Sequence, residues 1–178
     1  MTAAGVIEIR VEQFKQLFNS LDPSPFRERD LDDNAEEYIV SWARELPARQ
    51  PIEIVVHLPE AEARAAAQHG IETAFQHYFQ DRADMTQREL REELRIGRRY
   101  LWVGLPILAG CLALSQVARR SIEAEGLSFL AQESLIIFGW VASWKAIETL
   151  LYEWQPVKRR LDLYRRLAVA HVVVRAPT

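Results

Sequence analysis

The sequence predicts an α+β protein. We expect a small three-stranded cytoplasmic sheet with helices, plus a two-helix transmembrane hairpin that is inserted before the last helix and strand. Three observations predict this class. Three short segments alternate apolar and polar residues, two longer segments are almost free of charge, and basic residues gather beside those two segments. A chain of 178 residues has room for one such domain with a few added elements.

Strands are expected at 6–12, 51–58 and 171–176. Apolar residues such as Ile7 and Ile9 occupy alternate positions there, so they share one face of a strand. The third strand follows both membrane helices in the chain. It is expected to return to the sheet and so to complete the soluble domain.

Helical spacing of apolar residues predicts three helices before the membrane segments. Two lie between the first two strands, and the third follows the second strand. Their apolar faces are formed by Phe14, Leu17, Phe18 and Leu21 in the first, by Ala35, Tyr38, Ile39, Trp42, Ala43 and Leu46 in the second, and by Ile71, Phe75, Tyr78 and Phe79 in the third. The second helix is expected to begin with a capping box of Asp33 and Glu36, to bury Trp42 and to stop at Pro47. The third is expected to begin near Pro59.

Two segments are apolar enough to span a bilayer. Residues 100–117 carry no charge, and their length is about 27 Å as a helix, against a hydrocarbon core of roughly 30 Å. Residues 134–152 are apolar except for Lys145 and Glu148. Aromatic residues that suit the headgroup level are Trp102, Trp140, Trp144, Tyr152 and Trp154. A buried hairpin of a soluble protein is the alternative.

Arg and Lys flank these segments unevenly. Five precede the first segment, five follow the second, and two occur in the connector at 118–133. By the positive-inside rule we expect both termini in the cytoplasm and the short connector on the other side of the membrane. Anionic lipid headgroups attract such side chains. The expected headgroup contacts are Arg98, Arg99, Lys158, Arg159 and Arg160.

Charge is divided between the two halves of the chain. Residues 1–87 have a net charge of -8, from 8 Lys and Arg against 16 Asp and Glu, whereas residues 88–178 have +5, from 14 against 9. The membrane accounts for the basic half, so no nucleic-acid partner is expected. We expect an acidic α+β domain at 1–87, a juxtamembrane helix and hairpin at 88–156, and a helix with the returning strand at 157–178.

The two charges inside the second segment form a candidate site. A lysine near the centre of a span costs about 2.5 to 3.5 kcal/mol on insertion scales. Lys145 and Glu148 are three residues apart, so they share a helix face and can neutralise each other. The pair either locks the helices or neighbouring subunits in register, which we favour, or lines a polar path for protons or ions. Two spans cannot enclose a pore, so a path would require a ring of subunits.

Other chemistry is not indicated. The single Cys111 cannot form a disulfide within the chain. His69 and His77 lie about 12 Å apart along a helix, too far to share one ion without further ligands, so no metal site is expected. The sequence contains no phosphate loop, nucleophile elbow, metalloprotease pair or dinucleotide fingerprint. We therefore expect no catalytic residue and no cofactor.

The loop at 19–33 is the densest polar stretch of the chain. Its prolines and aspartates favour a rigid connector with turns and caps. The alternative is a docking site for another protein, which would use Asp22, Phe26, Arg27, Arg29 and Asp30.

Residues 139–156, GWVASWKAIETLLYEWQP, resemble a segment of a family of uncharacterised bacterial two-span membrane proteins. That segment has Gly-Trp-Val-Ala-x-Trp, a basic residue, Ile-Glu, and Leu-Tyr-acid-Trp-x-Pro. The matching positions are Trp140, Trp144, Lys145, Ile147, Glu148, Tyr152, Glu153, Trp154 and Pro156. Residues 21–45 are also similar to the front of those proteins, and the two stretches cover about a quarter of the chain. The family often has proline at the position of Ala146, so no helix break is carried over.

The resemblance implies a membrane location and makes the basic residue with Glu148 a family feature. Together with the charge pattern, it predicts a non-enzymatic inner-membrane protein. Such a protein would form homo-oligomers through its hairpin and present the acidic domain to protein partners, as a scaffold or accessory subunit. The alternative is an oligomeric ion or proton transport subunit that uses Lys145 and Glu148.

Overall fold

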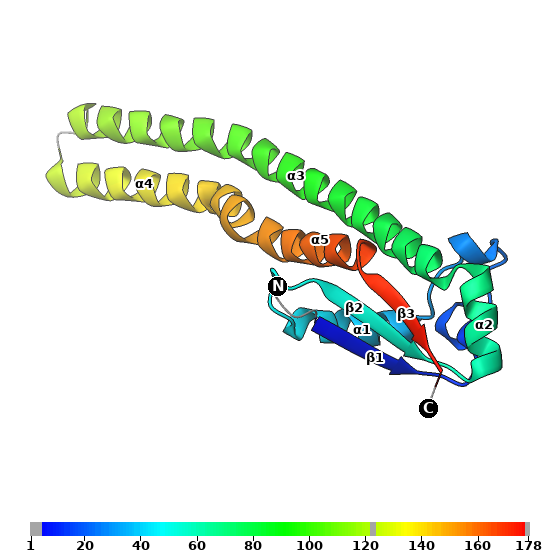
Figure 1. Ribbon diagram of the computed structural model, residues 1–178. Helices are drawn as coiled ribbons and strands as arrows, with labels where there is room; N and C mark the ends of the chain where they lie inside the picture. Colours follow the sequence, from blue (N-terminus) through cyan, green and yellow to red (C-terminus); the bar gives the residue numbers. More distant parts are fainter. Residues whose placement is uncertain (1–4, 122–123, 177–178) are drawn as a thin grey trace. The chain divides into compact units, whose positions relative to one another are not determined.

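The computed structural model describes residues 5–121 and 124–176 (Figure 1). The elements in chain order are β1 (Gly5–Arg10), η1 (Phe14–Leu17), η2 (Phe26–Glu28), α1 (Asp33–Glu45), β2 (Ile52–His57), α2 (Glu60–His69), α3 (Ile71–Ser121), α4 (Glu125–Glu148), η3 (Thr149–Glu153), α5 (Trp154–Ala168) and β3 (His171–Arg175). They form two compact units. The first contains the described residues up to Thr86 and from Arg159 onward, and the second contains Gln87–Lys158.

The first unit is built on a sheet of three parallel strands in the order β1-β2-β3. In its register, Ile7 of β1 lies beside Ile54 of β2, which lies beside Val172 of β3. Helices connect the strands, as parallel pairing requires. The predicted mixture of helices with three strands is confirmed, and the last strand does return to the sheet.

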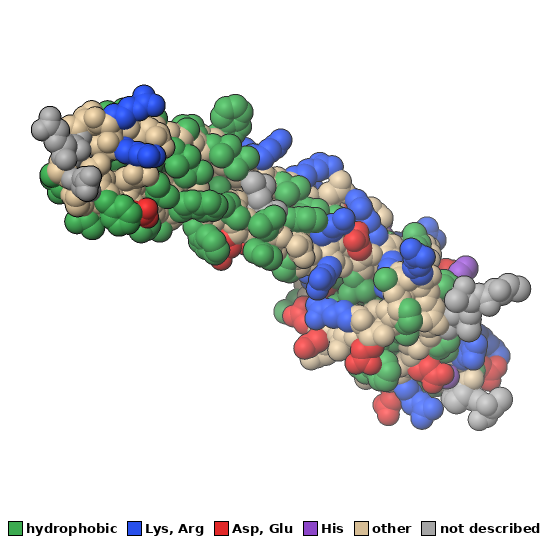
Figure 2. Space-filling view, turned by 90° about the vertical axis from the view of Figure 1, so that its left-hand side faces the viewer, with side chains coloured by type: hydrophobic (Ala, Val, Ile, Leu, Met, Phe, Trp, Pro, Cys, Tyr) green, Lys and Arg blue, Asp and Glu red, His purple; other side chains and the backbone are tan. Residues whose placement is uncertain are grey.

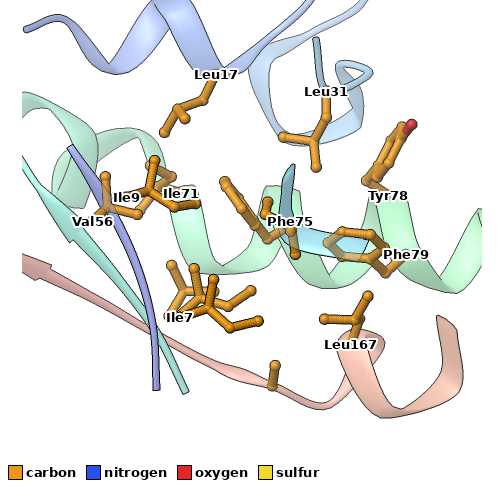
Figure 3. Packing of buried hydrophobic residues seen from close by; sticks show 14 of the residues in the cluster. Ile7, Ile9, Leu17, Leu31, Val56, Ile71, Phe75, Tyr78, Phe79 and Leu167 are labelled. Carbon is orange, nitrogen blue, oxygen red and sulfur yellow. The ribbon is translucent and has the colours of Figure 1, made fainter. Parts of the chain in front are cut away.

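One face of the sheet packs against α3. Figure 3 shows Phe75 and Phe79 of α3 between Leu31 on one side and Ile7 and Leu167 on the other, and all five side chains are at most 2% exposed. Burial along β1 alternates strictly between buried and exposed residues. On β1 this places buried and exposed residues on opposite faces, as the alternating sequence pattern predicts, whereas Val55 on the outer face of the central strand β2 is also fully buried.

The first predicted helix is only a single 3-10 turn, η1. Phe14 and Leu17 are buried in it, but Phe18 is already extended and pairs with Leu31 in an isolated antiparallel bridge. Leu21 is consequently 88% exposed, and its predicted place on an apolar helix face is wrong.

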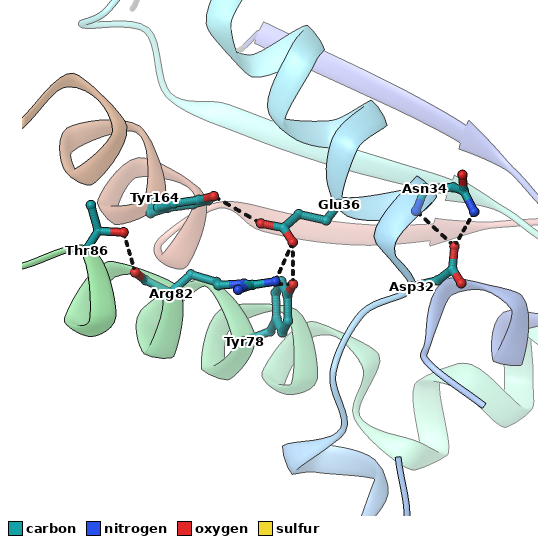
Figure 4. Close-up of polar contacts among 7 residues, drawn as sticks. All are labelled: Asp32, Asn34, Glu36, Tyr78, Arg82, Thr86 and Tyr164. Atoms are coloured by element: carbon teal, nitrogen blue, oxygen red, sulfur yellow. Dashed lines mark hydrogen bonds and ion pairs between the residues drawn. The ribbon is translucent and has the colours of Figure 1, made fainter. Parts of the chain in front are cut away.

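The cap of α1 also differs by one residue. Asp32, not Asp33, is the N-cap, and its carboxylate accepts a hydrogen bond from the backbone N–H of Asn34 at 3.0 Å (Figure 4). The predicted capping box is therefore wrong. Glu36 instead accepts hydrogen bonds from side chains of α3 and α5.

Trp42 is 48% exposed, so its predicted burial is wrong. The inner face of α1 is narrower than the apolar pattern indicated and consists of Ile39, Val40 and Ala43. Trp42 lies beside Tyr38 with 6.1 Å between ring centroids, and the Tyr38 hydroxyl donates to the backbone carbonyl of Glu8 on β1. This pair covers the margin of the sheet instead of filling its core.

The helix predicted from Pro59 is two helices. α2 ends at His69, and Gly70 then adopts a left-handed conformation with φ of 74° before α3 begins at Ile71. Glycine reaches this conformation without the steric cost that a Cβ would add. α3 continues without interruption for 51 residues, through Pro106, to Ser121.

In the second unit, α3 and α4 pack together as an antiparallel hairpin. The hydroxyl of Ser143 on α4 donates to the backbone carbonyl of Gly104 on α3 at 3.1 Å and to that of Gly139 at 2.9 Å. A Cβ at Gly139 would lie only 3.0 Å from the Cβ of Cys111. Small residues thus let the two helices approach closely, as in membrane helix pairs. Residues 122–123 of the predicted connector lie outside the described residues.

Candidate functional site

The described chain contains two helices that are long and apolar enough to cross a membrane, as predicted. Most of their apolar surface faces outward. In the most apolar 18-residue windows, only 17% of the residues are buried in α3 and 24% in the helix that follows it. Trp102 is 80% exposed and Val141 is 68% exposed. Figure 2 shows hydrophobic side chains over most of the visible face of this part. Soluble monomers rarely expose apolar patches of this extent, so the hairpin is not a buried core of this chain.

The register of the hairpin gives the depth of the charged residues. Because Ser143 lies opposite Gly104, antiparallel counting places residue 147 level with Tyr100, where the first predicted span begins. Lys145 is then about 3 Å inside that level and Glu148 lies at its edge. Counted from the end of the second predicted span at Tyr152, Lys145 is about 10 Å inside and Glu148 about 6 Å inside, so by either span the pair lies in the half of the apolar surface nearer to that end.

The charged side chains form a cluster of three. Lys145 Nζ lies 3.5 Å from Glu148 Oε2 and forms a closer ion pair with Glu153 Oε1. The three side chains are 54%, 45% and 36% exposed, respectively. The predicted pair is thus brought together, but with a second carboxylate, and the cluster has one more negative than positive charge.

Glu153 reaches the cluster through the π-helical turn η3. In an α-helix, residues eight apart point roughly 80° away from each other, so sequence spacing gives no reason to pair Lys145 with Glu153. The five residues Thr149–Glu153 instead follow the wider i to i+5 pattern, which removes much of that offset. Turns of this kind occur frequently at functional sites.

The predicted aromatic residues are mostly on the surface. Trp140 and Trp144 are 54% and 61% exposed, and Tyr152 is 64% exposed. Trp154 is half-buried, and the ammonium of Lys158 lies 5.5 Å from its ring centroid. Of the other predicted headgroup contacts, Arg98, Arg99 and Arg159 are exposed and Arg160 is half-buried.

The loop at 19–33 is held by its own side chains. The Asp22 carboxylate accepts from the backbone N–H groups of Ser24 at 2.9 Å and Asp30 at 2.8 Å. A hydrogen bond from the Ser24 side chain, together with these two, lowers the pKa of Asp22 below its usual range. Arg29 donates to the Ser24 carbonyl at 3.3 Å. The Phe26 ring packs 4.6 Å from that of Phe18. Of the five predicted docking residues, Arg27 and Asp30 are exposed.

The first unit contains a polar network that was not predicted from the sequence (Figure 4). Glu36 of α1 accepts from the Tyr78 hydroxyl at 2.6 Å and from Arg82 at 2.8 Å, both on α3, and from the Tyr164 hydroxyl of α5 at 3.0 Å. Burial and the hydrogen bond to Glu36 raise the pKa of Tyr78 far above its usual value. Burial likewise raises the pKa of Tyr164. One carboxylate thus connects three helices.

A signal for this network is present in the sequence. Glu36 lies three and seven residues before Ile39 and Ala43, so it falls on the buried stripe of α1. A carboxylate on such a stripe requires a partner. Tyr78 and Arg82 lie one helical turn apart on α3, and Arg82 also donates to the Tyr78 hydroxyl at 2.9 Å.

A depression of about 590 Å³ lies where β1 and β2 end. Arg10 and His57, the last residues of these strands, line it with Val11, Glu12, Gln16, Leu58 and Pro59. His57 Nε2 faces the Glu8 carboxylate at 3.6 Å. The mixed signs of these side chains define no particular ligand.

Within residues 5–121 and 124–176, no group of three or more His, Cys, Asp and Glu side chains is placed to hold a metal ion. His69 Nδ1 lies 2.7 Å from the Ala65 carbonyl, and His77 lies 3.4 Å from Asp81.

Comparisons of the chain with protein-family models, curated proteins and solved structures find no match.

Proposed function

We propose that this protein is a non-enzymatic protein of the bacterial inner membrane that assembles through its hairpin and presents its acidic unit to cytoplasmic partners. The observation that carries the proposal is the outward apolar surface of α3 and α4. Residues such as Trp102 and Val141 are exposed on it, while the polar hydroxyl of Ser143 is turned inward and satisfied by backbone carbonyls. A lipid environment favours this distribution and water opposes it.

The orientation follows from the arrangement of Arg and Lys. Five basic residues precede the first span and five follow the second. In the sequence, both groups lie between the spans and the segments that form strands. The positive-inside rule assigns this end to the cytoplasm. The first unit, whose residues 1–86 and 159–178 carry 13 Lys and Arg against 17 Asp and Glu, would then be available to cytoplasmic partners. Its net charge of -4 favours basic ones.

Transport of ions or protons is the second candidate, supported by the charges of Lys145 and Glu148. The hairpin register weighs against it, because both charges lie in the half of the apolar surface nearer to one end. A conducting path would need polar groups across the full depth. Anchoring and assembly explain the same charges without such a path.

Two measurements on purified protein separate the candidates. Native mass spectrometry from lipid nanodiscs tests assembly, and a monomer at all protein-to-lipid ratios would remove the oligomer from the proposal. Proton or ion flux into liposomes tests transport. Flux that disappears on Lys145→Ala would favour the transport candidate, whereas a verified oligomer without flux would remove it.

The Lys145–Glu148 pair itself is tested by exchanging the two charges. If it holds the assembly together, Lys145→Glu with Glu148→Lys should recover most of the detergent-stable oligomer that either single alanine variant loses. Failure of that recovery would count against a structural role. The reference chain and all three variants should carry Glu153→Gln, because Glu153 is the closer partner of Lys145 and would otherwise face the carboxylate introduced at position 145.

A further inference from the structure

We propose that a second copy of this chain docks against the charged cluster, with Arg98 and Arg99 of one copy pairing with Glu148 of the next. This inference rests on the proposed assembly through the hairpin and names the surface that performs it. The two copies would be related by an axis normal to the bilayer, so that equal residues lie at equal depth.

The first support is the surplus carboxylate. Lys145 pairs most closely with Glu153 through the π turn, while its distance to Glu148 is 3.5 Å, near the limit of a hydrogen bond. Glu148 is 45% exposed. Its oxygens can therefore accept further hydrogen bonds from outside the chain, and at the edge of a bilayer an uncompensated carboxylate is costly.

The second support is a set of cations without partners. Arg98 and Arg99 are exposed, and in the part of the chain that the structure describes neither makes an ion pair or hydrogen bond. Neighbouring Arg95 differs, because it pairs with Glu92 at 3.3 Å. Arginine is suited to this role because its planar guanidinium can bind a carboxylate with two parallel hydrogen bonds.

The third support is depth. Antiparallel counting from Gly104 opposite Ser143 places Arg99 level with Glu148 on the same hairpin. Within one chain the two residues nevertheless do not pair. A second copy in the same orientation presents its own Arg99 at that depth, so charge and level match without tilting either hairpin. Arginine pairs of this kind are stronger at the membrane edge than in bulk water because the effective dielectric constant is lower.

Proximity is tested first by cross-linking. In a background with Cys111→Ser, one chain carries Glu148→Cys and a second carries Arg99→Cys, and the two are mixed in nanodiscs of phosphatidylethanolamine and phosphatidylglycerol. Oxidation should give a mixed disulfide dimer. The matched control is Arg120→Cys, at the far end of the same helix, which should give at least tenfold less cross-linked product. Equal yields from the two positions would overturn the proposed surface.

Charge reversal then tests the pairing. Fluorescence energy transfer between labelled copies should show at least tenfold weaker association for Glu148→Arg and for Arg99→Glu. The two substitutions combined in one chain should restore association to within about threefold of the wild type. Arg120→Glu should leave it unchanged.

The outcomes separate this inference from the proposed function. If the single reversals leave association at the wild-type level, or if the combined variant does not recover it, the Arg–Glu surface is overturned but the oligomer remains. Absence of wild-type association in the nanodiscs removes both.

Discussion

Replacing Glu36 by alanine is expected to destabilise the first unit more than any other single change to an acidic side chain on α1. The Glu36 side chain is only 14% exposed and accepts hydrogen bonds from Tyr78, Arg82 and Tyr164. The substitution removes all three at once. It also leaves the guanidinium of Arg82, a side chain that is 37% exposed in the intact protein, without its counter-charge.

The magnitude follows from these contacts. Hydrogen bonds to a charged acceptor contribute about 1.5 to 3 kcal/mol each, and a simple sum would be too large because the partly exposed Arg82 and the tyrosine hydroxyls can be rehydrated. We expect a loss of about 2 to 4 kcal/mol in the free energy of unfolding. For a unit of this size the melting temperature should fall by roughly 10 °C or more.

The assay is thermal unfolding of the full chain in detergent micelles, followed by near-ultraviolet circular dichroism. Glu37→Ala is the matched control, because Glu37 is exposed on the same helix and should change stability by no more than about 0.5 kcal/mol. Glu36→Gln keeps the shape but loses the charge, so it should fall between the two. Equal melting temperatures for Glu36→Ala and Glu37→Ala would refute the reasoning that the network is a stabilising one.

Two further predictions concern alkaline pH and hairpin packing. The folded state holds the Tyr78 proton at a pH where the unfolded chain has lost it, so this stabilisation is complete below about pH 10 and declines above it. Denaturant titrations between pH 10 and 12 should thus show a shallower decline for Tyr78→Phe than for the wild type, and parallel curves would contradict this. Gly139→Val should cost about 1 to 3 kcal/mol of hairpin stability because its Cβ meets Cys111, whereas Gly110→Val should cost much less because nothing lies within 4 Å. Unfolding in mixed micelles measures the loss of stability in each glycine variant. Equal losses for Gly139→Val and Gly110→Val would argue against the packing of α3 on α4.

Strands and apolar helices could be predicted because each depends on a local pattern. Alternation places Ile7 and Ile54 on one face in any sheet that buries that face, and both are in the core. The apolar run at 100–117 needs no partner to be recognised. Boundaries were harder to predict, because the break at Gly70 depends on a left-handed glycine inside a segment that otherwise has helical spacing.

The polar sites could be predicted only in part, because they depend on contacts between distant segments. Lys145 and Glu148 share a helix face, so their proximity follows from spacing alone. Glu153 joins them only because five residues form a π turn, which the sequence does not reveal. Glu36 and Tyr164 lie 128 residues apart in the chain, and their contact requires the tertiary packing of α1 and α5.

Insertion of the hairpin with both chain ends in the cytoplasm is tested most directly by labelling in intact cells. In a Cys111→Ser background, a membrane-impermeant thiol reagent should label Arg120→Cys in intact cells, while a reporter that fluoresces only in the cytoplasm should be active when fused after Thr178. Protection of Arg120→Cys until the cells are lysed, or recovery of the chain in the soluble fraction, would contradict the proposed membrane hairpin.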